Sequence, residues 1–134
     1  MNNLSRILIA DDDAVFWATC LRAENSDETL DIEIALTPAQ YRTTVAEQEF
    51  DLVILDISFG VYSEDGFDLL SDIRRRRPAT KVVMFSGMDH PAIVASAKRL
   101  GAHGFLSKGA LTPNGLWSDV KATLKLPPKT IAPM

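Results

Sequence analysis

Five charged or hydroxyl side chains stand directly after short, mostly apolar runs of this sequence. Asp11 and Asp12 follow the first run, and Asp56 follows the third. Ser86 follows the fourth run, and Lys108 follows the fifth. Three carboxylates held close together repel one another, and a hard divalent cation with oxygen ligands, such as Mg²⁺, relieves that repulsion. A magnesium ion beside one lysine and one hydroxyl is a binding site for a phosphoryl group.

Phosphoryl transfer is the reaction that this set of side chains suits. It requires positioning and charge neutralisation more than covalent chemistry by the protein. The metal and Lys108 neutralise charge on the phosphoryl oxygens, and Ser86 donates a hydrogen bond to another oxygen. The remaining carboxylate attacks the phosphorus atom, a known role of aspartate that produces an acyl phosphate.

The elements that must position these residues are short strands that alternate with longer amphipathic helices. Strands are expected at residues 6–10, 32–36, 51–55, 81–85 and 104–107. Helices are expected at residues 14–24, 38–47, 67–77, 91–100 and 111–125. Five strand–helix repeats are typical of an α/β fold with a parallel sheet.

The apolar pattern predicts which strand lies at an edge of the sheet. Strands covered by helices on both faces read as continuous apolar runs, and such runs occur at residues 7–10, 52–55 and 82–85. In the second strand, Glu33 stands between two isoleucines, which is typical of an edge strand with one wet face. That strand also ends without a functional side chain, although ligands bind at the carboxyl ends of strands. We therefore predict the strand order 2-1-3-4-5.

Residues that start and stop helices agree with these ranges. Asp13 precedes the first predicted helix and is suited to cap it, while Pro38 and Pro91 occupy first helical turns. Pro78 ends the third helix, and Gly101 is placed for a left-handed C-cap after the fourth.

Composition restricts the classes of protein that this chain can belong to. Its 134 residues are 46% apolar and 24% charged, with a formal net charge of −4. This length suits one domain that needs neither a disulfide nor a structural metal to fold, and the single cysteine, Cys20, suits a reducing compartment. No apolar run approaches the roughly 20 residues of a membrane span, and the acidic N-terminus lacks a signal peptide. The negative charge argues against direct nucleic-acid binding, so we expect a single cytoplasmic domain.

Four short motifs surround the candidate residues, at residues 7–13, 51–56, 82–87 and 101–108. Intervals of 44, 30 and 22 residues separate Asp12, Asp56, Ser86 and Lys108 in turn. Together these motifs resemble the receiver domains of two-component response regulators. The resemblance implies a flavodoxin-like, doubly wound (βα)5 sandwich of three layers. We expect this receiver domain at residues 1–126, followed by a proline-rich tail or linker at residues 127–134.

The resemblance also implies roles for individual residues. Asp56 resembles the phosphoacceptor, and Lys108 resembles the phosphate-binding lysine. Asp11 and Asp12 resemble the acidic pair that holds Mg²⁺ together with Asp56, and the backbone carbonyl of Ser58 is a further expected ligand. The expected donor is a phosphohistidine on a histidine kinase or a histidine phosphotransfer protein. Such a domain is a signalling receiver with weak autophosphorylation and autodephosphorylation, not an enzyme.

Two further positions resemble the conformational switch of the family. Ser86 matches its serine or threonine position, and Phe105 matches its aromatic position. Phosphorylation is then expected to shift the population of a surface formed by the fourth helix, the fifth strand and the fifth helix. A downstream partner or a second copy of the chain is expected to bind that surface.

The sequence departs from the family pattern at two loops. The loop at residues 57–66 lacks the usual proline and is about two residues longer. Gly109 stands where family members often carry a proline after the lysine, so we expect a trans peptide bond or a locally different loop there.

Other functions remain as alternatives. A pseudo-receiver would bind partners without phosphorylation, and the unusual loop at residues 57–66 is its only support. A magnesium phosphohydrolase would need an acid where Ser58 stands, and a flavin-binding module would need a phosphate-binding loop where three aspartates stand. The residues after Lys125 leave no room for an effector domain, so the sequence fits a stand-alone receiver or a piece of a longer regulator.

Several remaining residues are better explained by structure than by chemistry. The arginine run at residues 74–77 is expected to be a solvated helix end, with Asp72 paired to Arg76. Cys20 is expected in the core. His90 and His103 lack metal-ligand spacing. Trp117 is expected at the margin of the buried stripe of the fifth helix. This position has two interpretations, core packing and contact with a partner.

Overall fold

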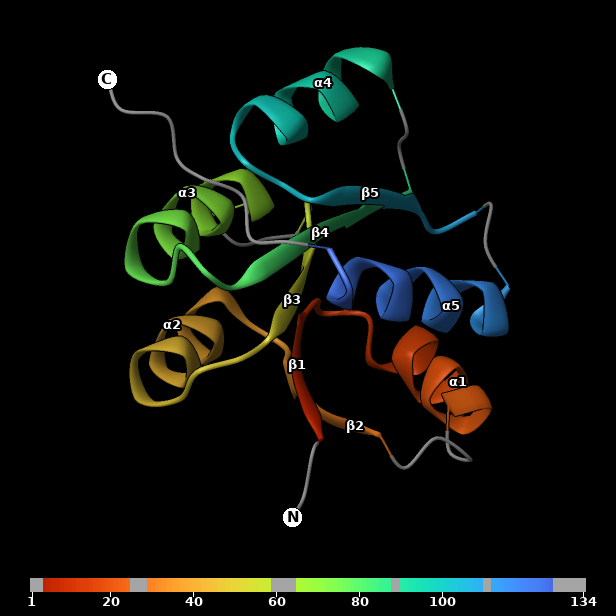
Figure 1. Ribbon diagram of the computed structural model, residues 1–134. Coiled ribbons are helices and arrows are strands. Elements are labelled where there is room, and N and C mark those ends of the chain that lie inside the picture. The colour runs from red at the N-terminus through yellow and green to blue at the C-terminus, as the bar shows by residue number, and fades with distance from the viewer. Residues whose placement is uncertain (1–3, 25–28, 59–64, 88–89, 110–111, 127–134) are drawn as a thin grey trace.

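A five-stranded parallel sheet forms the centre of the structure (Figure 1). The computed structural model describes residues 4–24, 29–58, 65–87, 90–109 and 112–126. The strands are β1 (Ser5–Ala10), β2 (Leu30–Ala35), β3 (Leu52–Asp56), β4 (Lys81–Ser86) and β5 (Gly104–Ser107). Their order is β2-β1-β3-β4-β5, which confirms the order predicted from the apolar pattern.

Helices cover both faces of this sheet. They are α1 (Ala14–Glu24), α2 (Pro38–Glu47), α3 (Gly66–Arg76), α4 (Pro91–Arg99) and α5 (Pro113–Leu124). Helices α1 and α5 lie on one face, and α2, α3 and α4 lie on the other (Figure 1). The result is the predicted α/β sandwich of three layers. No helix in the described part of the chain has the length and apolar character that crossing a bilayer requires.

Alternation along the strands divides the core between the two faces. Successive strand residues point to opposite sides of a sheet, so Ile7 and Ile9 of β1 pack toward α1 and α5. Leu8 and Ala10 of the same strand pack toward α2 and α3. All four are buried, as expected for a strand with helices on both faces. Strand β2 alternates between half-buried and exposed residues up to its buried end, which agrees with its edge position.

Capping side chains explain where several helices begin. Asp13 accepts a hydrogen bond from the Phe16 N–H at 3.0 Å, as predicted. Helix α3 begins at Gly66, one residue earlier than expected, because Asp65 and Asp68 form a reciprocal capping box. Helix α5 begins at residue 113 and not at 111, because the Thr112 side chain accepts from the Gly115 N–H at 3.1 Å. Residue 111 itself lies outside the described residues.

Strand β2 starts two residues earlier than predicted, at Leu30. It pairs with β1 over its whole length, from Leu30 opposite Ser5 to Ala35 opposite Ala10. The backbone ladder with β1, which the sequence pattern does not display, therefore sets the start of this strand. Gly101 has a φ of 102° at the end of α4, so its predicted left-handed conformation is confirmed.

The second tryptophan lies in the core that α1 and α5 form with one face of the sheet. Trp117 is only 4% exposed, and its indole N–H donates to the Cys20 carbonyl oxygen at 2.7 Å. Cys20 is buried beside it, as predicted. Of the two interpretations of Trp117, the structure therefore supports core packing over contact with a partner.

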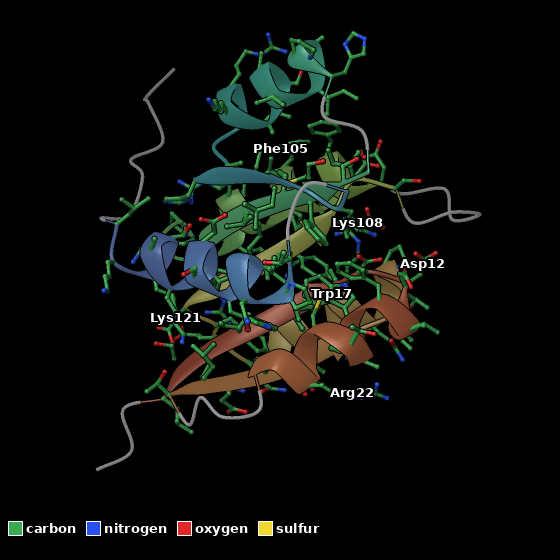
Figure 2. All side chains as sticks on the ribbon, turned by 90° about the vertical axis from the view of Figure 1, so that its right-hand side faces the viewer. Asp12, Trp17, Arg22, Phe105, Lys108 and Lys121 are labelled. Atoms are coloured by element: carbon green, nitrogen blue, oxygen red, sulfur yellow. The ribbon has the colours of Figure 1, made fainter. Side chains whose placement is uncertain are left out.

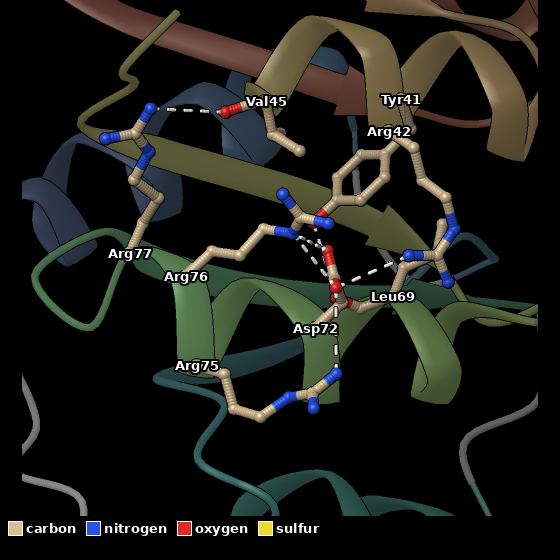
Figure 3. A network of polar contacts seen from close by, with 8 residues as sticks. All are labelled: Tyr41, Arg42, Val45, Leu69, Asp72, Arg75, Arg76 and Arg77. Carbon is tan, nitrogen blue, oxygen red and sulfur yellow. Dashed lines mark hydrogen bonds and ion pairs between the residues drawn. The ribbon is translucent and has the colours of Figure 1, made fainter. Parts of the chain in front are cut away.

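A carboxylate on α3 forms ion pairs with arginines of two helices (Figure 3). Asp72 lies 3.4 Å from Arg42 of α2, 3.7 Å from Arg75 and 3.0 Å from Arg76. The predicted Asp72–Arg76 pair is thus present, and it belongs to a network that joins α2 to α3. Arg74 is an exception to the expected solvated helix end, because it is 4% exposed. Its guanidinium donates to two backbone carbonyl oxygens, those of Pro78 and Thr80, in the turn before β4.

Candidate functional site

The carboxyl ends of three strands bring the predicted carboxylates and the lysine together. Asp11 follows β1, Asp56 is the last residue of β3, and Lys108 follows β5. Asp11, Asp12 and Asp56 each direct one carboxylate oxygen so that the three oxygens lie within 4.8 Å of one another. Figure 2 shows Asp12 and Lys108 near the same end of the sheet. Parallel strands expose their carboxyl ends along one edge, which explains how residues about one hundred positions apart meet.

Asp11 is the most enclosed of the three carboxylates, with 1% of its surface exposed. Its Oδ2 atom lies 2.8 Å from the Lys108 ammonium and accepts a hydrogen bond from the Trp17 indole N–H at 2.9 Å. Its Oδ1 atom accepts from the backbone N–H of Asp13 at 3.0 Å. A buried carboxylate is costly unless it is paired and hydrogen-bonded, and three donors meet that requirement here.

Asp56 is also buried, but its partners are more distant than those of Asp11. Its Oδ2 atom lies 3.6 Å from the Lys108 ammonium, and its Oδ1 atom accepts from the Ser58 N–H at 3.2 Å. Burial raises the pKa of Asp56 to about 7, and the negative charge of Asp11 adds to this effect. Lys108 and the Ser58 hydrogen bond act in the opposite direction but do not cancel it. The local positive charge is therefore too small to keep this carboxyl fully ionised at neutral pH.

Lys108 is held between carboxylates and aromatic rings. Burial alone would lower its pKa, but the hydrogen bond and charge of Asp11, with the charge of Asp56, outweigh burial and raise it. Its ammonium lies 5.8 Å from the Phe16 ring centre and 5.5 Å from that of Phe85, within range of cation–π attraction. The lysine is therefore charged, and its position is restricted on two sides. The peptide bond to Gly109 is trans, as expected without a proline.

The two predicted switch residues lie on β4 and β5. Ser86 is buried at the carboxyl end of β4, and its carbonyl oxygen accepts from the Lys108 N–H at 2.8 Å. Phe105 lies on β5, opposite Met84 of β4, and is half-buried. Its ring packs against the core cluster on the α2–α3–α4 side, as does Ile93. Figure 2 shows Phe105 on the side of β5 that faces α4.

The loop after Asp56 is described only at its two ends. Ser58 is exposed, and its N–H donates the hydrogen bond to Asp56 Oδ1. Residues 59–64 lie outside the described residues, so the unusual part of the loop is not among them. At the far end, the Gly66 N–H donates to the Ile57 carbonyl oxygen at 2.9 Å, which closes the loop against β3.

The donor set fits a hard divalent cation. All three converging side chains are carboxylates, and Mg²⁺ prefers oxygen ligands and retains several waters. Burial and the charge of Asp11 raise the pKa of Asp56, and the positive charge of such an ion would act in the opposite direction. The residues therefore suit Mg²⁺ in both ligand type and charge.

The sequence pattern does not identify Trp17 as a residue of this site. It is six positions after Asp11 and lies on the buried face of α1. A tryptophan on an apolar helix face reads as core, and nothing in its spacing indicates that the indole N–H reaches a carboxylate. The docking of α1 against the sheet determines that contact.

A groove of about 740 Å³ lies at the opposite end of the sheet, among the residues before β1, β3 and β4. Arg77 lines it and is paired with Glu49 at 2.9 Å, and the Arg6 guanidinium donates to the Glu49 carbonyl oxygen. Both cations already have carboxylate partners, Asp31 for Arg6 and Glu49 for Arg77. Within the described part of the chain, the three carboxylates that converge as a group are those at the other edge. The groove does not contribute to the candidate site.

The site thus combines a carboxylate cluster with a facing lysine, at the carboxyl edge of a five-stranded α/β sandwich. The chain matches the family model described as the response regulator receiver domain over residues 7–120. It therefore belongs to the response regulator receiver family. Members of this family are signalling domains of two-component systems. They generally bind Mg²⁺ at an acidic pocket, and in general they have a kinase as partner.

Curated relatives share this domain as one part of a longer protein. The alginate biosynthesis transcriptional regulatory protein AlgB of Pseudomonas putida is 31% identical over 110 residues, which cover 80% of this chain and 23% of that protein. The DNA-binding transcriptional regulator NtrC of Rhizobium meliloti is 32% identical over 102 residues, which cover 76% of this chain and 20% of that protein. The chain thus spans about a fifth to a quarter of the length of these relatives.

Solved structures show the same fold at full domain length. A CheY-like response regulator receiver domain protein from Methanospirillum hungatei has a TM-score of 0.79 and 26% identity, and 90% of this chain and 94% of that chain are covered. The receiver domain of NtrX from Brucella abortus has a TM-score of 0.77 and 28% identity, with 89% and 98% covered. The predicted flavodoxin-like fold and the predicted family are both confirmed.

Proposed function

We propose that this chain is a phosphorylatable receiver of a two-component phosphorelay, with Asp56 as the phosphoacceptor. The observation that carries the proposal is the position of Asp56 at the carboxyl end of β3. There one of its carboxylate oxygens lies within 4.8 Å of an oxygen of Asp11 and of Asp12, and its Oδ2 atom lies 3.6 Å from the ammonium of Lys108. The partner that phosphorylates it is a histidine kinase or a histidine phosphotransfer protein in the cytoplasm.

In the proposed reaction, a carboxylate oxygen of Asp56 attacks the phosphorus atom of a phosphohistidine. The P–O bond forms as the P–N bond breaks, and the imidazole leaves with the electron pair and takes up a proton. The attack requires ionised Asp56, whose pKa of about 7 leaves much of it protonated at neutral pH. Lys108 binds a phosphoryl oxygen, and the Ser86 hydroxyl donates a hydrogen bond to another.

We infer that Asp11, Asp12 and Asp56 hold Mg²⁺ together with the backbone carbonyl of Ser58. The convergence of three carboxylate oxygens within 4.8 Å supports this ligand set. Bound Mg²⁺ supplies the positive charge that keeps the carboxylates ionised and neutralises the phosphoryl oxygens. The Ser58 N–H bond to Asp56 keeps the start of the loop close to the cluster.

The proposed output is a shift in the surface of α4, β5 and α5. Ser86 on β4 and Phe105 on β5 belong to paired strands, so a change at the phosphoryl group can reach the Phe105 ring. A downstream partner or a second copy of the chain binds that surface. We further propose that the receiver domain comprises residues 1–126 and that residues 127–134 are a tail or linker.

The proposed function is tested by intact mass after incubation with acetyl phosphate and Mg²⁺. We expect one added phosphoryl group on the wild type, and none in chelator or in Asp56→Asn. The matched control is Asp119→Asn, which removes an exposed carboxylate of α5. If the folded wild type takes up no phosphoryl group and forms no beryllofluoride complex, the chain is a pseudo-receiver and the proposal is wrong.

A further inference from the structure

We propose that Trp17 is a positioning residue for the proposed magnesium site, acting through a hydrogen bond to Asp11. Its indole N–H donates to Asp11 Oδ2 at 2.9 Å, and its side chain is 0% exposed. This inference rests on the proposed function, because it concerns how Asp11 is oriented for metal and phosphoryl binding.

Aromatic rings from three elements hold the Trp17 indole in place. The ring of Phe16 on α1 meets it edge-on at 5.2 Å. Phe85 of β4 lies at 5.3 Å, and Trp117 of α5 lies at 6.3 Å. With neighbours on these sides and no exposed surface, the indole N–H is a donor of nearly fixed position.

The contacts of Asp11 show why a fixed donor matters. Oδ2 of Asp11 accepts from Trp17 and also lies 2.8 Å from the Lys108 ammonium. The proposed reaction draws Lys108 toward the phosphoryl group on Asp56, away from that oxygen. Trp17 then remains as the donor to Oδ2, so the buried carboxylate keeps its orientation and its hydrogen bond. Without the indole N–H, Oδ2 would depend on Lys108 alone and would hold that lysine back.

The chain provides a matched pair of variants for this inference. Trp17→Phe removes the N–H that bonds Asp11 and keeps an aromatic ring. Trp117→Phe removes a second buried indole N–H from the same aromatic cluster, but that N–H bonds the Cys20 carbonyl oxygen and not the site. The two changes therefore cost similar packing, and they differ in the contact with Asp11.

We expect Trp17→Phe to weaken Mg²⁺ affinity about tenfold or more, the range found for partners that orient metal ligands. Trp117→Phe is expected to keep affinity near that of the wild type. Calorimetric titration with MgCl₂ measures both, and thermal unfolding shows that each variant is folded. Equal affinity in the two variants, or a Trp17→Phe affinity as tight as the wild type, would overturn the inference.

A second measurement follows the wild type, and it needs a variant only to assign the signals. The two indole N–H signals in a ¹⁵N–¹H spectrum belong to Trp17 and Trp117, and Trp117→Phe assigns them. During a Mg²⁺ titration, the Trp17 signal is expected to shift with the backbone amides of the site, and the Trp117 signal is expected to move little. A Trp17 signal that stays fixed while the amides of Asp12 and Asp56 shift contradicts the inference alone. A wild type that binds no Mg²⁺ contradicts the proposed function, and the inference fails with it.

Discussion

The Asp56 carboxyl combines two properties that oppose each other in the absence of a cation. It is buried beside Asp11, which raises its pKa to about 7, yet a nucleophile must be ionised to attack phosphorus. In the unfolded chain its pKa is close to the ordinary value of about 4, so the folded state binds this proton more tightly. Its contribution to stability is therefore complete below pH about 4 and is lost as the pH rises through about 7.

We predict that Asp56→Asn removes this pH dependence, because asparagine carries no charge to bury. In chelator, the wild type should lose about 2 kcal/mol of unfolding free energy relative to Asp56→Asn between pH 5.5 and pH 8. Urea unfolding at the two pH values measures the difference. Asp119→Asn, at an exposed carboxylate of α5, should follow the wild type. Parallel pH profiles for the wild type and Asp56→Asn would show that Asp56 titrates normally.

At the scale of elements, the junction between β3 and α3 sets the position of Asp56. The first residue of α3, Gly66, packs directly on the backbone of the strand end. A Cβ atom there would lie 2.2 Å from the Asp56 carbonyl oxygen and 2.8 Å from the Ile57 Cα atom. Backbone atoms cannot move aside as a flexible side chain can, so this close approach requires glycine. The helix therefore fixes the end of the strand that carries the phosphoacceptor.

We predict that Gly66→Ala destabilises the protein by about 1–3 kcal/mol and also weakens Mg²⁺ binding. Both effects follow because the added methyl group must push the helix away from the Asp56 backbone. Gly109→Ala is the control, since a Cβ atom at Gly109 has nothing within 4 Å and this residue also adjoins the site, next to Lys108. Denaturant unfolding and MgCl₂ titration give the two readouts. Equal stability of the two alanine variants would contradict the close packing seen here.

At the scale of the whole molecule, the site exists only where the separate parts of the fold meet. Asp11, Asp56 and Lys108 come from three strands, and Trp17 comes from a helix packed on one face. Each face of the sheet has its own apolar core cluster. Because the unfolded chain has no such cluster of carboxylates, an ion held by all of them binds the folded state preferentially.

We predict that MgCl₂ raises the unfolding temperature of the wild type in a concentration-dependent way. At one hundred times the dissociation constant, the gain is about 2.7 kcal/mol of unfolding free energy. The gain should be small in Asp12→Asn, which removes an exposed carboxylate of the cluster. Thermal unfolding over a series of MgCl₂ concentrations provides the measurement. An unfolding temperature that does not respond to MgCl₂ would argue against a metal site at these residues.

Much of this arrangement follows from local sequence patterns. Continuous apolar runs predict central strands, and the alternation around Glu33 predicts the edge strand, because burial on two faces or one leaves a direct mark on composition. The residues after each run predict the group of Asp11, Asp12, Asp56 and Lys108, since parallel strands end along one edge. The predicted ends of helices were less accurate where a capping side chain, such as Asp65, determines the first helical residue.

Other features depend on contacts between distant parts of the chain, and only the tertiary structure decided them. The Trp117 indole N–H bonds a carbonyl oxygen 97 residues away, and Arg74 is buried against the turn before β4. The raised pKa of Asp56 and the Trp17–Asp11 hydrogen bond likewise require the docking of α1 and the strands. Side-chain periodicity records which face of an element is buried, but it does not record which group on the opposing element each polar atom meets. The sequence by itself therefore determined the sheet and the set of residues at its edge, and the packing of the helices decided how those residues are held.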